Sequence, residues 1–448
     1  MSTGKFHIHT FGCQMNVHDS QQMAQILSEA GYEETDEVGS VDVIIINTCS
    51  VREKAAQKVY SHLGRLKKLK QIRPGLVMGV AGCLAQEHGT EFFRKFRYLD
   101  FVLGTHNIHR LPGMIEEISN TGSRIADTSF HRSVLSLGIR TLPPGGDVSA
   151  YVTIMQGCNN FCSYCIVPYV RGREGSRSST DIVDEIRFLA DSGIREVTLL
   201  GQNVNSYGRT LNGDTDFSKL LRMVNEIDGI DRIRFTTSHP KDLSENLVRC
   251  FADLDKVCEH IHLPVQSGSD YVLKGMKRGY TAEEYLGKIG MLRDACPEIS
   301  ITSDIIVGFP GESDDDFEKT IDLMKEVRFD NTFSFKYCDR RGTASEKYDG
   351  KVKESVGSER LSTLQVLQEK HSLEKNRRLE GRVEEVLIEG ISKNNEADIT
   401  GRTRGNKIVN LAGDTDLIGS AVRVKIVQAY THSLRGEMLG GGEKCLLR

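Results

Sequence analysis

Three cysteines within eight residues carry the strongest chemical signal in this sequence. Cys158, Cys162 and Cys165 follow an apolar run at residues 151–155 and have the spacing C-x3-C-x2-C. A structural zinc site takes four ligands, and no fourth Cys or His follows nearby in the sequence. Three thiolates suit an iron–sulfur cluster better, and a four-iron cluster with three cysteine ligands keeps one iron open to a substrate. The alternative is that these thiols are buried apolar groups on a loop.

This spacing resembles the signature of radical S-adenosylmethionine (SAM) enzymes. In that superfamily the open iron chelates the amino and carboxylate groups of SAM. One electron from the cluster then splits a carbon–sulfur bond and gives a 5′-deoxyadenosyl radical. The resemblance implies a [4Fe-4S] cluster and SAM as cofactors, with Cys158, Cys162 and Cys165 as the cluster ligands.

A second group of three cysteines follows a repeated strand–helix pattern. Apolar runs end just before Cys13, Cys49 and Cys83, and the predicted helices cover residues 19–30, 51–70 and 87–96. Alternating short strands and helices predict a parallel α/β sheet, whose ligand sites lie at the carboxyl ends of strands. We therefore expect the three cysteines to converge into a second cluster site. Each cysteine alone could instead pack as a small hydrophobic residue.

The middle of the chain repeats this alternation six times. Strands are predicted at residues 151–156, 196–201, 232–237, 260–264, 300–308 and 332–337, and helices at 181–192, 217–227, 282–295 and 313–327. Six consecutive βα units predict an open TIM-like (β/α)6 barrel, which is also the fold that the resemblance to radical SAM enzymes implies. The first cysteine loop then lies on the catalytic face of the barrel.

Polar residues that follow the predicted barrel strands are candidates for SAM contacts. Gln202, Ser238, Gln266 and Asp304 each lie at or near the end of a different strand, where hydrogen bonds to ribose, amino group or adenine are expected. Each is weak evidence alone, because polar loop residues are common.

Three arginines come shortly after the cysteine loop. Arg171 is expected to bind the SAM carboxylate, to neutralise cluster charge or to hold substrate phosphate, and Arg173 and Arg177 are candidates for RNA contacts. The ordinary alternative for all three is ion pairing with nearby acids such as Glu174.

The C-terminal segment changes character after a predicted helix at residues 354–378. Short alternating runs at 381–388, 398–401 and 421–427 predict a small antiparallel β-barrel. The segment resembles the TRAM domain, an RNA-binding module of tRNA-modifying enzymes. Arg402, Arg404 and Lys407 are its candidates for phosphate contact.

Composition places these parts in a large intracellular chain. The 448 residues are 38% hydrophobic and 27% charged, and we expect domains at 1–125, 151–378 and 379–448 with a linker at 126–150. Eleven cysteines without paired spacing argue against a disulfide scaffold and for a reducing cytoplasm. No run resembles a signal peptide or a membrane helix. The net charge of −4 means that RNA binding must rest on local patches, for which the Lys- and Arg-rich helix at 51–73 is a candidate unless it is simply a solvated face.

The sequence around Cys13, Cys49 and Cys83 resembles the methylthiotransferase family. The residues of both cysteine regions are most similar to the MiaB branch of that family. This resemblance implies that Cys13, Cys49 and Cys83 hold an auxiliary [4Fe-4S] cluster that supplies sulfur, and that two SAM molecules are used per turnover. It implies transfer of a methylthio group to carbon 2 of an isopentenylated adenosine beside the tRNA anticodon. The expected partners are a tRNA anticodon stem-loop, a low-potential donor such as a flavodoxin or ferredoxin, and a sulfur-supply protein. We expect a monomer.

The chemistry explains why two clusters are needed. Carbon 2 of adenine has a strong aromatic C–H bond that a side-chain base or nucleophile does not activate, whereas a carbon radical can abstract that hydrogen. Three alternatives stay open. Two are methylthiotransferases, one for threonylcarbamoyl-adenosine in tRNA and one for a ribosomal-protein aspartate. The third is a two-cluster electron carrier bound to RNA.

Overall fold

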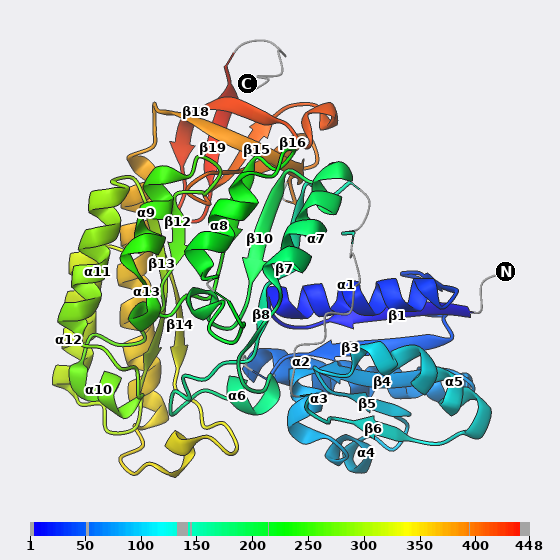
Figure 1. The fold of residues 1–448 in the computed structure, drawn as a ribbon. Coiled ribbons are helices and arrows are strands. Elements are labelled where there is room, and N and C mark those ends of the chain that lie inside the picture. Colours follow the sequence, from blue (N-terminus) through cyan, green and yellow to red (C-terminus); the bar gives the residue numbers. More distant parts are fainter. Residues whose placement is uncertain are drawn as a thin grey trace.

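The computed structural model describes residues 4–50, 53–131, 142–143, 146–213, 215–393 and 395–439. Within these residues the chain forms an N-terminal α/β domain, a central barrel and a small C-terminal barrel at the end of the central one (Figure 1). The predicted fold class is therefore confirmed. Much of the predicted linker at 126–150 lies outside the described residues.

The N-terminal domain is built on a parallel six-stranded sheet in the order β2-β1-β3-β4-β5-β6. Its strands are β1 (Gly4–Thr10), β2 (Tyr32–Glu34), β3 (Val43–Thr48), β4 (Val77–Gly82), β5 (Phe101–Leu103) and β6 (Ile125–Asp127). One face is covered by α1 (Gln14–Glu29) and α5 (Leu111–Thr121), and the other by α2 (Glu53–Ile72), α3 (Cys83–His88) and α4 (Glu91–Lys95). Covering both faces explains why β3 and β4 read as continuous apolar runs.

Local chemistry shifts two of the predicted helices. α1 begins five residues earlier than expected, because Cys13 is its N-cap and the Cys13 amide donates to Oδ1 of Asn16 at 3.4 Å. The helix expected at 87–96 is divided into α3 and α4, and Gly89 between them has φ +49°. Strands β2, β5 and β6 were not predicted, since three residues are too few to show a hydrophobic period. β6 lies across the predicted boundary at residue 125.

The central barrel has six parallel strands in two hydrogen-bonded sets, β7-β10-β11 and β12-β13-β14. A bridge between Ile233 and Val257 connects the sets. The strands are β7 (Ser149–Thr153), β10 (Glu196–Leu200), β11 (Arg232–Phe235), β12 (His260–His262), β13 (Ser300–Val307) and β14 (Asn331–Lys336). All six lie where the sequence predicts strands, in the open TIM-like arrangement.

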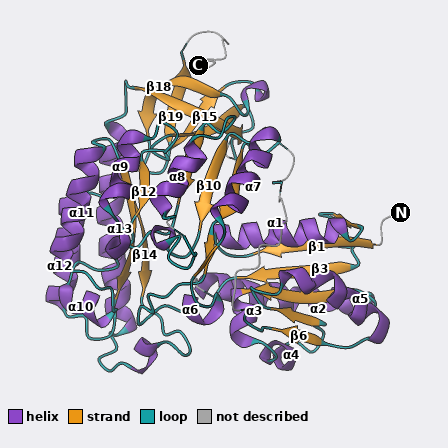
Figure 2. Cartoon of the chain, viewed as in Figure 1, coloured by secondary structure: helices purple, strands orange, loops and turns teal. Residues whose placement is uncertain are grey.

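Helices lie on the outer side of these strands (Figure 2). They are α7 (Ser179–Asp191), α8 (Phe217–Asn225), α9 (Glu245–Asp253), α10 (Asp270–Gly275), α11 (Ala282–Ala295), α12 (Asp314–Val327) and α13 (Glu354–Arg377). The short helix α6 (Val167–Val170) lies instead between the barrel and the N-terminal domain, against α3. Thr281 and Ser313 form capping boxes that set the starts of α11 and α12, as predicted. α13 packs along the barrel, where Gln368 donates to the carbonyl of Phe329 at 3.0 Å.

The C-terminal domain is a closed barrel in the order β15-β16-β17-β19-β18. Its strands are β15 (Val383–Ile391), β16 (Asp398–Thr403), β17 (Ile408–Ala412), β18 (Ala421–Ala429) and β19 (Leu434–Met438). Four neighbouring pairs are antiparallel, as predicted, and β17 with β19 is parallel. Five strands in a closed ring cannot all alternate in direction, so one parallel pair is required.

Within the residues that the structure describes, no helix is both long and apolar enough to cross a membrane.

Candidate functional site

The loop after β7 carries the barrel cysteine site, which consists of Cys158, Cys162 and Cys165. Two short strands, β8 (Met155–Gln156) and β9 (Gly175–Ser176), pair across the base of this loop. Gly157 has φ +79°, and a Cβ there would lie 2.1 Å from the carbonyl oxygen of Arg173, so glycine is required. The Gly157 amide donates to Oε1 of Gln202, which fixes the start of the loop to the end of β10.

The thiols of the barrel cysteine site are close enough to affect one another's titration. Burial, with a smaller contribution in the same direction from the neighbouring Cys162, raises the pKa of the Cys158 thiol to about 11 and that of Cys165 to about 12. Metal binding requires thiolates, so formation of a cluster here must be accompanied by proton release.

Arg278 is a buried cation against this site. Its Nη1 donates to Sγ of Cys162 at 3.5 Å, Nε to the hydroxyl of Tyr280 at 2.9 Å and Nη2 to the carbonyl of Pro264 at 2.7 Å. The residue is 4% exposed, and among the described residues no carboxylate forms an ion pair with it. A buried guanidinium without a carboxylate needs another anion, which the thiolates of a cluster supply.

The N-terminal cysteine site consists of Cys13, Cys49 and Cys83, which the sheet brings together as predicted. Cys13 and Cys49 follow β1 and β3, and Cys83 begins α3 after β4. A hydrogen bond with Cys49 lowers the pKa of the Cys13 thiol to about 6, and burial raises the pKa of Cys83. The β1–β3 neighbourhood is the topological switch point of the sheet, where the chain leaves in opposite directions, and such points form ligand crevices.

Two asparagines hold the loops of the N-terminal cysteine site. Nδ2 of Asn16 donates to the carbonyl of Thr48 at 3.0 Å, and Nδ2 of Asn47 donates to the carbonyl of Asn16 at 2.8 Å. Gly12 has φ +147°, and a Cβ there would lie 2.9 Å from Cβ of Cys49. These contacts tie the strand ends together independently of any bound group.

Arg171 connects the two cysteine sites. It lies six residues after Cys165, and its Nε donates to Sγ of Cys83 at 3.2 Å. Its Nη2 also forms a buried ion pair with Asp19 at 2.6 Å. This placement matches the ordinary alternative for Arg171, an ion pair with an acid, but with Asp19 rather than Glu174, and the same guanidinium also contacts a thiol of the N-terminal cysteine site.

Further polar contacts join the N-terminal domain to the barrel near Arg171. Oγ1 of Thr105 donates to the carbonyl of Val170 at 2.7 Å, and Oγ1 of Thr153 is 3.0 Å from Nδ1 of His18. These contacts are buried, so the segment that contains the barrel cysteine site is also part of the domain interface.

Three predicted SAM contacts, Gln202, Ser238 and Gln266, follow the carboxyl ends of β10, β11 and β12, whereas Asp304 lies within β13. Oγ of Ser238 and Oε1 of Gln266 are buried and have no hydrogen-bond partner in the described residues. Gln266 has φ +75°, a conformation that a non-glycine residue adopts only at a cost. Asp304 is 3.4 Å from Nε2 of His262. Gln202 contacts the cysteine loop through Gly157.

Neighbouring residues carry more unsatisfied polar atoms. Of the twelve buried side-chain N and O atoms without partners in the described residues, five lie in the loops after β10, β11 and β12: those of Asn203, Asn205, Ser238, His239 and Gln266. Buried polar groups are normally paired, so such a group of orphans indicates a polar ligand. Asn203, Asn205 and His239 were not predicted as individual contacts, since their loops alone do not show which side chain points inward.

The arginines predicted to contact RNA beside the barrel loop differ in exposure. Arg173 is exposed and lies 5.6 Å over the ring of Phe161, which is itself exposed. Arg177 is mostly buried, pairs with Glu185 at 2.7 Å and donates to the carbonyl of Thr153 at 2.6 Å. Arg173 is therefore accessible to a ligand, whereas Arg177 has a structural role in this conformation.

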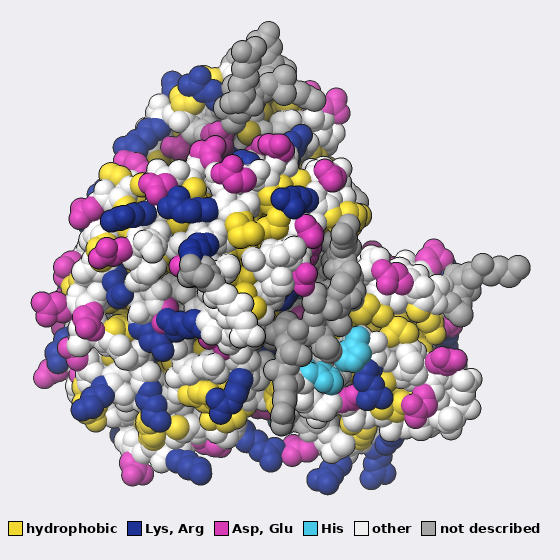
Figure 3. Space-filling view, in the orientation of Figure 1, with side chains coloured by type: hydrophobic (Ala, Val, Ile, Leu, Met, Phe, Trp, Pro, Cys, Tyr) yellow, Lys and Arg dark blue, Asp and Glu magenta, His cyan; other side chains and the backbone are white. Residues whose placement is uncertain are grey.

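Two of the three RNA-contact candidates in the C-terminal barrel pair with acids of the central barrel. Arg404 forms a two-pronged ion pair with Glu259, and Nζ of Lys407 is 2.9 Å from Asp330. Arg402 is partly exposed and pairs with Glu389, within its own domain. The prediction that these three contact RNA therefore gains no support from their placement, because acids already neutralise them. On the face drawn in Figure 3, Lys and Arg are interspersed with Asp and Glu.

Arg278 and Asp19 were not among the site residues predicted from the sequence. Each lies far along the chain from the residue that it contacts, with a separation of 116 residues between Arg278 and Cys162 and of 152 between Asp19 and Arg171. Among the described residues, no group of three or more His, Cys, Asp or Glu side chains is arranged to hold a single metal ion. An iron–sulfur cluster does not require its ligands to converge on one ion, since each thiolate binds its own iron. The six cysteines stay a prediction as cluster ligands.

Comparison with known proteins identifies the three parts of the chain. Residues 5–104 match the family described as "Uncharacterized protein family UPF0004", residues 152–324 match the radical SAM superfamily, and residues 377–439 match the TRAM domain. Radical SAM enzymes use SAM and a [4Fe-4S] cluster.

Among solved structures, the radical SAM methyltransferase TsrM from Kitasatospora setae is similar in fold. Its TM-score is 0.59 at 14% identity, over 77% of this chain and 74% of that one. The cobalamin-dependent SAM radical enzyme OxsB gives 0.52 at 11% identity, over 82% and 56%. These two likenesses concern the fold alone.

Curated relatives match nearly the full length. Proteins named tRNA-2-methylthio-N(6)-dimethylallyladenosine synthase are 60% identical in Syntrophus aciditrophicus (97% of this chain, 94% of the relative) and 51% in Geotalea uraniireducens (96% and 98%). The relative of that name in Syntrophobacter fumaroxidans is also 51% identical (97% and 95%). The chain is therefore a radical SAM transferase that belongs to the family of tRNA-2-methylthio-N(6)-dimethylallyladenosine synthases.

Proposed function

We propose that this chain adds a methylthio group to carbon 2 of N6-isopentenyladenosine beside the anticodon of tRNA, with sulfur delivered through the N-terminal cysteine site. The shared name and near full-length identity of the relatives support this substrate. The observation that carries it is the segment from the barrel cysteines to Arg171, which links Cys165 to Cys83 across the domain interface. Sulfur delivery to a radical site requires two such centres side by side.

The donor chemistry fits two [4Fe-4S] clusters. Each site offers three thiols and one buried arginine that donates to a thiol, Arg278 at Cys162 and Arg171 at Cys83. When bound, the barrel cluster with SAM supplies a 5′-deoxyadenosyl radical, and the auxiliary cluster supplies the sulfur, with two SAM molecules used per turnover.

The protein's own part is to bind, orient and exclude water. Ser238 and Gln266 offer unpaired polar atoms toward the barrel face, and Gln202 fixes the cysteine loop beside them. Burial around this face keeps water from a reactive radical. The target base must leave its stack to reach this face, and a single-stranded anticodon loop permits that at low cost.

The same proposal specifies partners and location. A low-potential flavodoxin or ferredoxin would supply electrons, and a sulfur-supply protein would replenish the auxiliary cluster. The cytoplasm is the expected location, because tRNA and reduced thiols are found there. We further propose that the protein acts as a monomer, with domains close to residues 1–125, 151–378 and 379–448.

The test is anaerobic turnover of the reconstituted enzyme with dithionite, SAM and an isopentenylated anticodon stem-loop, followed by nucleoside mass spectrometry. We expect one methylthio group on the isopentenyladenosine and release of 5′-deoxyadenosine. Modification of only a threonylcarbamoyl-adenosine RNA would overturn the substrate and keep the chemistry. Modification of a ribosomal-protein aspartate alone, or no product from any RNA, would overturn the RNA assignment.

A further inference from the structure

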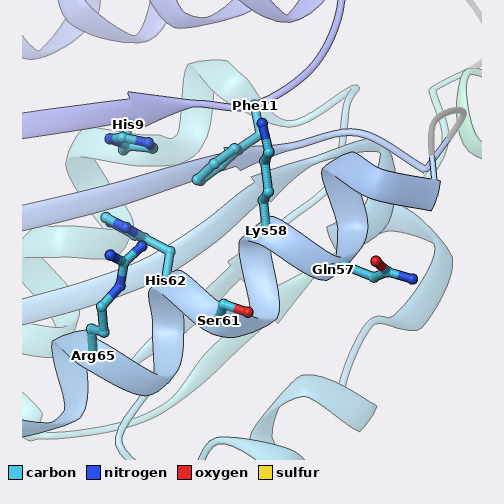
Figure 4. A pocket seen from close by; sticks show the side chains of 7 residues that line it. All are labelled: His9, Phe11, Gln57, Lys58, Ser61, His62 and Arg65. Carbon is cyan, nitrogen blue, oxygen red and sulfur yellow. The ribbon is translucent and has the colours of Figure 1, made fainter.

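A groove lies between β1 and α2 of the N-terminal domain (Figure 4). Its volume is about 870 Å³, and its lining residues are His9, Phe11, Gln57, Lys58, Ser61, His62 and Arg65. α2 packs its apolar side onto β3 and β4, so the part of β1 that faces α2 is only half-buried. The groove is thus a consequence of the switch point, where the chain leaves β1 and β3 in opposite directions.

Three aromatic rings make one wall of the groove. The rings of His9 and His62 are stacked, with centroids 4.3 Å apart and planes inclined by 18°. Phe11 lies 4.4 Å from His9 and 5.7 Å from His62. Figure 4 shows the side chains of His9 on β1 and of Phe11 just after it turned toward α2. Such a wall offers flat faces that stack on a planar ligand.

The surroundings of both histidines disfavour the charged form of the ring. Burial, with smaller contributions from the neighbouring His9 and Arg65, lowers the pKa of His62 to about 4. Burial also lowers the pKa of His9, with the same sign from His7 and Arg65. The rings therefore act as aromatic surfaces, and the positive charge of the groove comes from Lys58 and Arg65.

Free cations continue along α2 from the groove. Lys58, Arg65, Lys67 and Lys68 are exposed, and in the described part of the chain none of them forms an ion pair. Farther along, Lys70 pairs with Asp100 and Arg73 pairs with Asp42. The half of the helix next to the groove thus presents uncompensated positive charge, which complements a polyanion.

The groove also lies close to the N-terminal cysteine site. β1 ends at Thr10, Phe11 in the groove donates its amide to the carbonyl of Asn47 at 2.9 Å, and Cys13 follows two residues later. A ligand that stacks on Phe11 and His62 is therefore next to the strand ends that carry Cys13 and Cys49.

We propose that this groove binds an unpaired nucleotide of the substrate RNA, distinct from the modified adenosine, with its base stacked against the aromatic wall at His62 and Phe11 and its phosphate at Arg65 and Lys58. Aromatic rings beside free cations match a base and its phosphate, whereas an acidic protein would need only the cations. The inference rests on the proposed function and extends it to a second contact on the same RNA.

The test measures binding of an isopentenylated anticodon stem-loop to the reconstituted enzyme by fluorescence anisotropy at several salt concentrations. His62→Ala should weaken binding about tenfold, because stacking on one aromatic residue has that order of effect. His62→Phe should bind like the wild type, since it keeps the ring. Arg65→Glu should weaken binding at least about tenfold and reduce the slope against salt by about one, as expected for a lost phosphate contact.

Controls separate this contact from folding and from general charge. Lys370→Glu on α13 changes charge equally, at an exposed position outside the groove, and should leave the dissociation constant within about twofold. SAM cleavage without RNA should be unchanged in every variant. Abasic nucleotides placed singly in the loop should identify one position whose removal weakens wild-type binding and weakens His62→Ala no further.

The outcomes are distinguishable. Wild-type affinity in both His62→Ala and Arg65→Glu would overturn the inference and leave the proposed function intact. Slower reduction by a flavodoxin or ferredoxin, with unchanged RNA affinity, would overturn it in favour of a protein-binding surface. A wild-type enzyme that neither binds nor modifies the RNA would overturn the proposed function and this inference together.

Discussion

The two cysteine sites each bring three thiols together, but from differently arranged segments of the chain. The thiols of the barrel cysteine site come from one short loop, which Gly157 and Gln202 fasten to the barrel. The thiols of the N-terminal cysteine site come from three separate strand ends of a preformed parallel sheet. The first site depends on loop conformation, whereas the second depends on the sheet being folded.

The two cysteine sites also differ in the net charge of the arginine that contacts each of them. Arg171 at Cys83 is neutralised by Asp19, so the pair brings no net charge to the N-terminal cysteine site. Arg278 at Cys162 has no carboxylate partner among the described residues and brings a full positive charge. A buried cation stabilises the more negative, reduced state of a nearby centre. The barrel site is thus suited to accept an electron, and the N-terminal site to remain close to neutral.

The largest expected effect comes from removing one cysteine at a time, because loss of each site should eliminate a different reaction product. Cys162→Ala should abolish 5′-deoxyadenosine formation, because it removes a ligand of the centre that cleaves SAM. Cys49→Ala should keep part of that activity and lose sulfur insertion. Nucleoside mass spectrometry and 5′-deoxyadenosine chromatography measure the two products, and iron content should fall by about half in each variant.

Cys250→Ala is the matched control, since Cys250 is buried in the barrel core away from both sites and should retain full iron. Complete loss of both products in both cysteine variants would contradict the division of labour.

The second effect tests the charge difference. Arg278→Gln removes the unpaired cation, so the barrel centre should become harder to reduce. At a fixed potential its ratio of reduced to oxidised form should fall at least about tenfold, which corresponds to 59 mV for one electron. A redox titration followed by electron paramagnetic resonance measures this shift.

Arg278→Lys keeps the charge and should retain most of the potential, although it loses the fork that reaches both Cys162 and Pro264. The auxiliary centre should not respond to either change. An unchanged barrel potential in Arg278→Gln would refute the role of this charge.

Much of the fold was predictable because its signals are local. The six barrel strands and the helix beginning at Ala282 follow from hydrophobic runs and a capping box. The three-residue strands β2, β5 and β6 were not predictable, since only pairing with neighbours defines them.

The site was predictable where spacing or strand ends reveal it. All six cysteines are grouped as the sequence indicated, because parallel strands end on one edge and the loop spacing is short. The partners of Arg171, Arg404 and Lys407 were not predictable, because each lies on another domain or far along the chain. From sequence alone, a basic residue in a motif is equally consistent with a contact to a ligand and with an ion pair between two domains.

The smallest expected effect is on stability and concerns the buried ion pair between Arg171 and Asp19. Arg171→Met or Asp19→Leu alone leaves a buried charge without its partner and should lower the free energy of unfolding by about 3 kcal/mol. The double variant removes both charges and should recover most of that loss. Urea unfolding of the apoprotein measures each midpoint, and Arg187→Met, which breaks the exposed pair with Asp184, should cost at most about 1 kcal/mol.

This series decides whether the two arginines act alike. If Arg171 serves mainly to dock the barrel on the N-terminal domain, the double variant should be folded and its auxiliary centre should keep its potential, because Asp19 already cancels the charge. A fall in that potential in the double variant, as large as the one expected for Arg278→Gln, would mean that Asp19 does not screen Arg171 from Cys83. The difference between the sites would then lie in ligand geometry alone, and not in charge.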